Sequence, residues 1–154
     1  MGSIRTGTDE EEAIYLAWLM HLIGDIHQPL HCSDNRDRGG NEVRLDFFGR
    51  NMNLHSVWDG GLLGRMTPEN ELFTTWSKDL SGGRANKWGK GTVRDWAEQT
   101  HKAAVKFVYG RLPMASASQI HVTADYEKLA EPLIQQQIER AGARLAATLN
   151  AALK

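Results

Sequence analysis

The pattern of hydrophobic and polar residues divides the chain into helical segments and one strand-like segment. Apolar residues are dense across residues 9–27, where Thr8 or Asp9 can cap a helix and the glutamates that follow suit its positive end. So many apolar positions predict a helix that is buried on most sides. Pro29 disfavours helical geometry at Gln28, so we expect the helix to end or bend there.

A strand pattern follows the polar loop at residues 32–40. Val43, Leu45 and Phe47 alternate with polar residues, and the stretch FGRNMN has the composition of a turn, which together predict a short β-hairpin. The later expected segments are helices from Asn53, from Thr67–Pro68, over about 92–109 and over about 122–153, with a glycine-rich linker at 81–91. The fold class is therefore mainly α with one short hairpin, in a single domain of residues 1–154.

Composition and charge narrow the function classes. The 154 residues carry a net charge of −1, so no large basic surface drives nucleic-acid binding, although bound metal ions can supply positive charge at a site. Cys32 is the only cysteine, which excludes an internal disulfide. The polar, acidic start MGSIRTGTDEEE is neither a signal peptide nor a membrane span, and we expect no membrane association.

The chemistry of the chain concentrates in two His–Asp pairs. His21 and Asp25 are four residues apart, and so are His55 and Asp59; this spacing places both members of a pair on one helix face. His31 lies between the pairs, just past Pro29. Imidazole nitrogens and carboxylate oxygens without thiolate are the ligands of hydrolytic zinc sites.

Each of these observations also has a structural explanation. A single His–Asp pair four residues apart is often a surface hydrogen bond. The apolar neighbours of Asp25 argue for a metal, because a buried carboxylate without a partner is costly. His27 is two residues from Asp25 and falls on the opposite helix face, so we expect a buried histidine that is hydrogen-bonded to the backbone.

The stretch DRGGN joins the first ligand cluster to the hairpin. Its paired glycines, Gly39 and Gly40, permit positive φ or a close approach of the backbone to a ligand. Arg38 and Asn41 are the side chains there that can contact a phosphate. An ordinary loop at the entry to a hairpin explains the same residues.

Taken together, the motifs of the chain resemble those of the zinc-dependent single-strand-specific nucleases of the S1/P1 type, which are more distantly related to bacterial zinc phospholipases C. The motifs that carry the resemblance are H-x3-D-I-H-Q-P-L-H, D-x-G-G-N and N-L-H-x3-D. The resemblance continues at Trp96-Ala97-Glu98 and through the final helix. It implies a helical nuclease/phospholipase C-like fold with three zinc ions in a cleft.

The resemblance also implies roles for individual residues. His21 would bind one zinc, and Asp25 would bridge that zinc and a second, with a zinc-bound water as the nucleophile. His31, His55 and Asp59 would hold the remaining zinc. The implied reaction is hydrolysis of single-stranded RNA or DNA to 5′-phosphorylated products, with removal of 3′-phosphates from nucleotides as a second activity.

The chain departs from the family pattern before His21. The family's N-terminal tryptophan and further His and Asp ligands have no counterpart there, so we expect an N-terminally truncated chain that forms the C-terminal portion of the fold. One complete zinc site is expected, at His31, His55 and Asp59, with a second weak and a third lost. Trp18 and its apolar neighbours would then be exposed, which makes oligomerisation possible. Family members are typically secreted or periplasmic, but the sequence leaves the localisation open.

Three functions remain open at this point. The first is a zinc phosphodiesterase acting on single-stranded nucleic acid or nucleotides. The second is a non-catalytic zinc-binding fragment of such an enzyme, which activity in the presence of zinc would distinguish from the first. The third is a phospholipase C-like hydrolase, for which an apolar rim around the site is expected.

Overall fold

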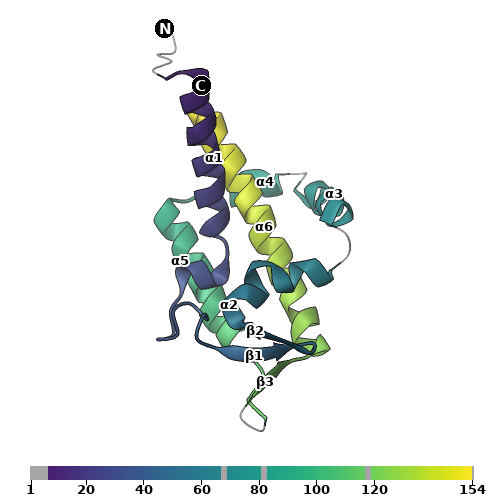
Figure 1. Ribbon diagram of the computed structural model, residues 1–154. Helices are drawn as coiled ribbons and strands as arrows, with labels where there is room; N and C mark the ends of the chain where they lie inside the picture. The colour runs from purple at the N-terminus through teal and green to yellow at the C-terminus, as the bar shows by residue number, and fades with distance from the viewer. Residues whose placement is uncertain (1–6, 67–68, 81–82, 117–118, 154) are drawn as a thin grey trace.

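The computed structural model describes residues 7–66, 69–80, 83–116 and 119–153, and these form a mainly helical structure with one small sheet (Figure 1). The α-helices are α1 (Asp9–Asp25), α2 (Leu54–Ser56), α3 (Glu69–Asp79), α4 (Arg84–Trp88), α5 (Val93–Ala103) and α6 (Ala124–Ala152). Other helical turns are the 3-10 helices η1 (Pro29–Cys32) and η3 (Leu63–Arg65) and the π-helices η2 (Val57–Gly61) and η4 (Ala104–Tyr109). The strands are β1 (Arg44–Phe47), β2 (Arg50–Asn53) and β3 (Ile120–Val122).

Helix α1 begins where the sequence predicts and ends two residues early. The Thr8 side chain accepts a hydrogen bond from the Glu11 backbone N–H at 3.3 Å, and the Glu11 carboxylate accepts one from the Thr8 N–H at 2.8 Å. This reciprocal cap fixes the first turn. At the other end, Gln28 is extended and its side chain caps η1, so the chain turns sharply before Pro29.

The expectation that the first helix is buried on most sides is wrong. Helix α1 packs against α6, and the two project together beyond the rest of the molecule (Figure 1). Because α6 covers only one side of it, Ile23 is the only buried residue of the helix. The expected exposure of Trp18, which is 58% accessible, is confirmed. Its exposed large apolar neighbours are Ile14, Tyr15, Leu16, Met20 and Leu22.

The predicted hairpin exists but belongs to a three-stranded sheet of order β2-β1-β3. Strands β1 and β2 pair antiparallel, with Leu45 opposite Met52, while β3 pairs parallel to β1, with Leu45 opposite Ile120. The last helix therefore begins at Ala124 rather than 122. Three residues of strand pattern are too few to identify in sequence, and their pairing is long-range.

The remaining segments agree with the predictions except in the expected linker. Helix α4 occupies residues 84–88, so the stretch 81–91 is not a linker throughout. The predicted helix at 92–109 is observed as α5 continued by η4. The predicted helix start at Thr67–Pro68 lies outside the described residues. Within the described part of the chain, no helix is both long and apolar enough to cross a membrane.

The hydrophobic core lies between the sheet, η2, η4 and α6, and it fixes the segment that carries Asp59. Trp58, next in sequence, is buried, and its indole N–H donates to the Tyr126 hydroxyl at 3.0 Å. That hydroxyl in turn donates to the Val108 carbonyl at 3.0 Å. Burial raises the pKa of Tyr126, which keeps the hydroxyl protonated as a donor. These two hydrogen bonds connect η2 with both α6 and η4.

Candidate metal centre

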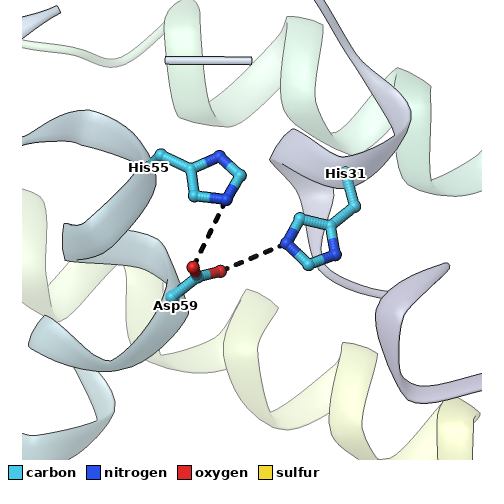
Figure 2. Close-up of side chains that lie close together, drawn as sticks. All are labelled: His31, His55 and Asp59. Carbon is cyan, nitrogen blue, oxygen red and sulfur yellow. Dashed lines mark ion pairs between the residues drawn. The ribbon is translucent and has the colours of Figure 1, made fainter. Parts of the chain in front are cut away.

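Three of the predicted ligands converge in one place. His31 from η1, His55 from α2 and Asp59 from η2 each offer one ligand atom, and these atoms all lie within 4.8 Å of one another. Figure 2 shows both imidazole rings directed at the Asp59 carboxylate from different elements. His31 Nε2 is 3.3 Å from Asp59 Oδ1, and His55 Nε2 is 3.3 Å from Asp59 Oδ2. We refer to these three residues as the His–His–Asp cluster.

The glycine loop orients His55. The Nδ1 of His55 lies 2.8 Å from the carbonyl oxygen of Gly39, so Nδ1 carries the proton and donates to it. The lone pair is therefore on Nε2, the nitrogen that faces Asp59. Gly39 has a φ of 63°, and a Cβ at this position would lie 2.7 Å from the Leu30 carbonyl oxygen. The positive φ that the paired glycines permit is confirmed here.

Asp59 is held by its own helix and by Gln28. It lies in the π-helix η2, so the predicted regular α-helix is interrupted between His55 and Asp59, yet the two side chains still meet. The Gln28 amide donates to Asp59 Oδ1 at 2.7 Å. The sequence analysis did not predict this role of Gln28. Its place directly before Pro29 was a usable signal, because a side chain there can cap the following turn, as the Gln28 side-chain oxygen does for η1.

The second predicted pair adjoins the cluster without completing a site. His21 Nε2 is 3.4 Å from Asp25 Oδ2, and Asp25 Oδ1 is 3.6 Å from His31 Nδ1. Among the described residues, His21 and Asp25 do not join a group of three possible ligands. The argument from burial is wrong for Asp25, whose side chain is 42% exposed, because the main contacts of α1 among the described residues are with α6 alone.

The donor set of the His–His–Asp cluster fits a zinc ion. Two neutral imidazole nitrogens and one carboxylate are a ligand set of catalytic zinc sites, which keep a further position open. The cluster is partly accessible, with side-chain exposures of 27%, 20% and 46% for His31, His55 and Asp59. The imidazole rings of His31 and His55 stack with centroids 5.1 Å apart, which is close enough for both residues to coordinate the same ion.

Arg38 and Asn41 lie on the same loop as Gly39, near the cluster. Both side chains are exposed, and Arg38 adopts a positive φ of 56°. The Asn41 amide donates to the Arg38 carbonyl at 2.9 Å, which closes the loop on itself. Asp37 anchors the loop from inside by accepting from the Tyr109 hydroxyl at 3.0 Å and from the Gly40 N–H at 2.9 Å.

A cavity of about 340 Å³ opens beside the cluster. Asp59 and Gln28 form one edge of it, and α1, η2, η3 and α6 supply walls that are largely apolar. Its lining residues are Gly24, His27, Gln28, Pro29, Trp58, Asp59, Leu63, Ile134, Gln137, Ile138 and Ala141. A flat, partly apolar group bound next to the cluster would fit these walls.

The other histidine in the first motif is structural, as predicted. His27 is 2% exposed; its Nδ1–H donates to the Ile23 carbonyl at 2.7 Å, and its Nε2 accepts from the Arg144 guanidinium at 2.6 Å. Burial, with the charge of Arg144, lowers the pKa of His27 to about 4. His27 is therefore neutral at pH 7 and has no free nitrogen for a metal.

Comparison with known proteins identifies relatives of the chain. The family model for S1/P1 nuclease matches residues 3–154. Endonuclease 2 of Arabidopsis thaliana is 30% identical over 153 residues, which cover 88% of this chain and 50% of the relative. Nuclease S1 of Aspergillus oryzae is 28% identical, with coverage of 88% and 53%. Nuclease P1 of Penicillium citrinum is 29% identical, with coverage of 93% and 59%. The chain thus spans about half the length of the curated relatives it matches.

Proposed function

The chain belongs to the S1/P1 nuclease family, and on that premise we propose that it takes part in zinc-dependent hydrolysis of phosphodiester bonds in single-stranded RNA or DNA. The products would carry 5′-phosphates, and removal of 3′-phosphates from nucleotides would be a second activity. We propose further that residues 1–154 correspond to the C-terminal portion of the family's fold. The observation that carries the proposal is the convergence of His31, His55 and Asp59 on one point.

The protein's contribution at this site is to hold its ligands in fixed positions. Zinc, when bound, supplies Lewis acidity toward a phosphate ester and lowers the pKa of water. His55 is held by Gly39, and Asp59 by Gln28, so the carboxylate and the imidazole keep their directions. His31 presents Nε2 to the cluster and Nδ1 to Asp25.

The groups around the cluster suit a nucleotide. We propose that Arg38 and Asn41 contact the phosphate, because both are exposed on the loop that orients His55. The adjoining cavity would take the base or sugar, since it combines apolar walls with the polar edge of Gln28 and Asp59. His21 and Asp25 would hold a second ion more weakly, next to the His–His–Asp cluster.

A non-catalytic zinc-binding role is the alternative that one observation favours. Among the described residues, His21 and Asp25 supply only two donors and join no group of three possible ligands. A site with two protein donors binds zinc weakly compared with a three- or four-ligand site. The His–His–Asp cluster would then hold one structural ion and stabilise the fold without turnover.

Cleavage of a single-stranded oligonucleotide in the presence of zinc tests the proposal. We expect His55→Ala to reduce the cleavage rate by more than about 100-fold, because it removes a ligand of the cluster. His121→Ala is the matched control, since His121 lies on the sheet and pairs with Asp46. Equal rates for the His55→Ala variant and the parent chain would refute the proposed site. Zinc binding without any cleavage would support the non-catalytic alternative.

We also propose that the exposed face of α1 supports self-association. It presents Trp18, Tyr15 and Leu22 to solvent, and exposed apolar patches of this kind mark association sites or aggregation liabilities. Sedimentation of the parent chain and of Trp18→Ser would test this. A monomer at every concentration in the parent chain would contradict it. The expectation of a secreted or periplasmic location stays a prediction.

A further inference from the structure

A groove between α4 and α6 lies apart from the metal centre. Two adjoining cavities, of about 700 and 470 Å³, run along it and share Lys87 and Trp88 in their walls. Figure 1 shows α4 alongside α6, on the end of that helix away from the sheet. None of the residues that line the two cavities belongs to the His–His–Asp cluster.

Cations line both walls of this groove. Arg84, Lys87 and Lys90 recur every third residue on and just after α4, while Arg140 and Arg144 are one turn apart on α6. In the described ranges, the first four form no ion pair within 4 Å. Arg144 is tied to His27, to Gln99 and to the Trp88 carbonyl, so it contributes charge and rigidity rather than a free guanidinium.

Trp88 positions two of these cations. The guanidinium carbons of Arg84 and Arg140 lie 5.6 and 5.7 Å from the centre of its ring, within the range of cation–π attraction. Burial lowers the pKa of Arg140, and its guanidinium donates to the Gln137 side-chain oxygen at 3.3 Å. A bound anion would offset the hydration that Arg140 loses through burial.

The two carboxylates of the groove are already engaged. Glu139 is buried and accepts a hydrogen bond from the Gln135 amide at 2.7 Å. Asp95 accepts from the Thr92 N–H at 2.7 Å and from its hydroxyl at 2.8 Å, in the cap of α5. Five cations against two carboxylates leave the groove positive in a chain whose net charge is −1.

We propose that this groove binds the phosphodiester backbone of a single nucleic-acid strand outside the metal centre. Two rows of cations that face each other across adjoining cavities match a string of phosphates better than one isolated anion. The contacts are to phosphates, so binding would not depend on base sequence. The inference rests on the proposed nuclease function for its choice of ligand, because that function requires the chain to hold a strand.

Binding of a fluorescein-labelled oligothymidylate, followed by anisotropy in EDTA, tests the proposal without cleavage. The test variant is Arg84→Glu/Lys87→Glu, in which both side chains are exposed, so the fold is expected to survive; circular dichroism and thermal unfolding check this. The matched control is Lys106→Glu/Arg111→Glu, which makes the same charge change on exposed residues elsewhere. We expect the test variant to bind about tenfold more weakly than the control and to lose about one unit of the salt-dependence slope.

A further variant and a competitor sharpen the assignment. Trp88→Leu should weaken binding about two- to fivefold by releasing Arg84 and Arg140, and Trp88→Phe should retain most of the affinity. Inorganic phosphate, at a concentration equal to that of the phosphate groups in the oligonucleotide, should not displace the oligonucleotide. Equal affinity in the test and control variants, or displacement by inorganic phosphate, would overturn the proposal. His55→Ala should still bind the oligonucleotide in EDTA, so a failure of the catalytic site and a failure of the groove are distinguishable.

Discussion

The Nδ1 of His55 and the carbonyl oxygen of Gly39 lie 2.8 Å apart, which couples the glycine loop to the orientation of a metal ligand. The bond places the His55 proton on Nδ1 and leaves Nε2 free toward Asp59. It depends on a backbone at Gly39 that a larger residue cannot adopt without displacing the Leu30 carbonyl. The glycine loop thus orients His55, and the four-residue spacing places Asp59 next to it.

Gly39→Ala should weaken zinc binding. Its φ of 63° is unfavourable for alanine, and the new Cβ would meet the Leu30 carbonyl at 2.7 Å, so the loop must shift away from His55. We expect a loss of zinc affinity of about 10- to 100-fold, the usual effect of removing an outer-shell partner. Gly49→Ala is the control measured beside it by calorimetry, since Gly49 has a φ of 83° but nothing within 4 Å of its Cβ. Similar zinc affinities for the two variants would show that the loop does not orient His55.

Gln28→Ala should also weaken zinc binding, by a different route. The Gln28 amide donates to Asp59 Oδ1 at 2.7 Å, and without it the carboxylate of a half-exposed side chain is free to rotate. The expected loss of affinity is again about tenfold or more. Gln136→Ala, on α6, serves as the comparison. If competition with a zinc-sensitive dye gave the same constant for both variants, Gln28 would have no positioning role.

The stability of the chain should fall in mild acid because of His27. Its pKa is lowered to about 4 in the folded state, against about 6.5 when unfolded, so the unfolded chain binds the additional proton. The stabilisation that neutral His27 contributes to the folded state is fully present above pH 6.5 and is lost as the pH falls toward 4. We expect a decrease of about 3 kcal/mol in the free energy of unfolding between pH 7 and pH 4 from this residue.

Urea unfolding at several pH values, in EDTA to remove metal linkage, measures this effect. His27→Gln should flatten the dependence between pH 4 and pH 6.5, whereas Gln136→Ala, which removes no titratable group, should leave it unchanged. The same slope in His27→Gln as in the parent chain would contradict the assignment of this acid sensitivity to His27.

Arg144→Met should destabilise the fold by about 2–4 kcal/mol. Arg144 is 2% exposed and donates to His27 Nε2 at 2.6 Å and to Gln99 Oε1 at 2.6 Å, so truncation leaves the buried His27 Nε2 without its donor. Combining it with His27→Leu in a double-mutant cycle should recover part of the loss, because the two side chains share one bond. Additive effects in thermal unfolding would show that the pair is not coupled.

The convergence of His31, His55 and Asp59 was predictable from the sequence because much of their geometry is local. A spacing of four residues puts Asp59 beside His55 even though a π-helix intervenes, and Pro29 forces the turn that brings His31 close. The glycine pair was informative for the same reason, since positive φ is a property of single residues.

Long-range relationships were not readable in the same way. Strand β3 is three residues that pair with β1 from more than 70 positions away, so nothing in its own sequence reveals it. The burial of α1 was misjudged because hydrophobic periodicity reports which face is apolar, not whether another element covers it. The exposure of Asp25 follows from the same missing cover.

Zinc content of the purified chain, measured by elemental analysis beside His55→Ala and His121→Ala, tests the central claim most directly. The account predicts one zinc per parent chain, retained in His121→Ala and lost in His55→Ala, because the His–His–Asp cluster is the one group of three possible ligands among the described residues. A parent chain without zinc, or zinc that persists undiminished in His55→Ala, would contradict it.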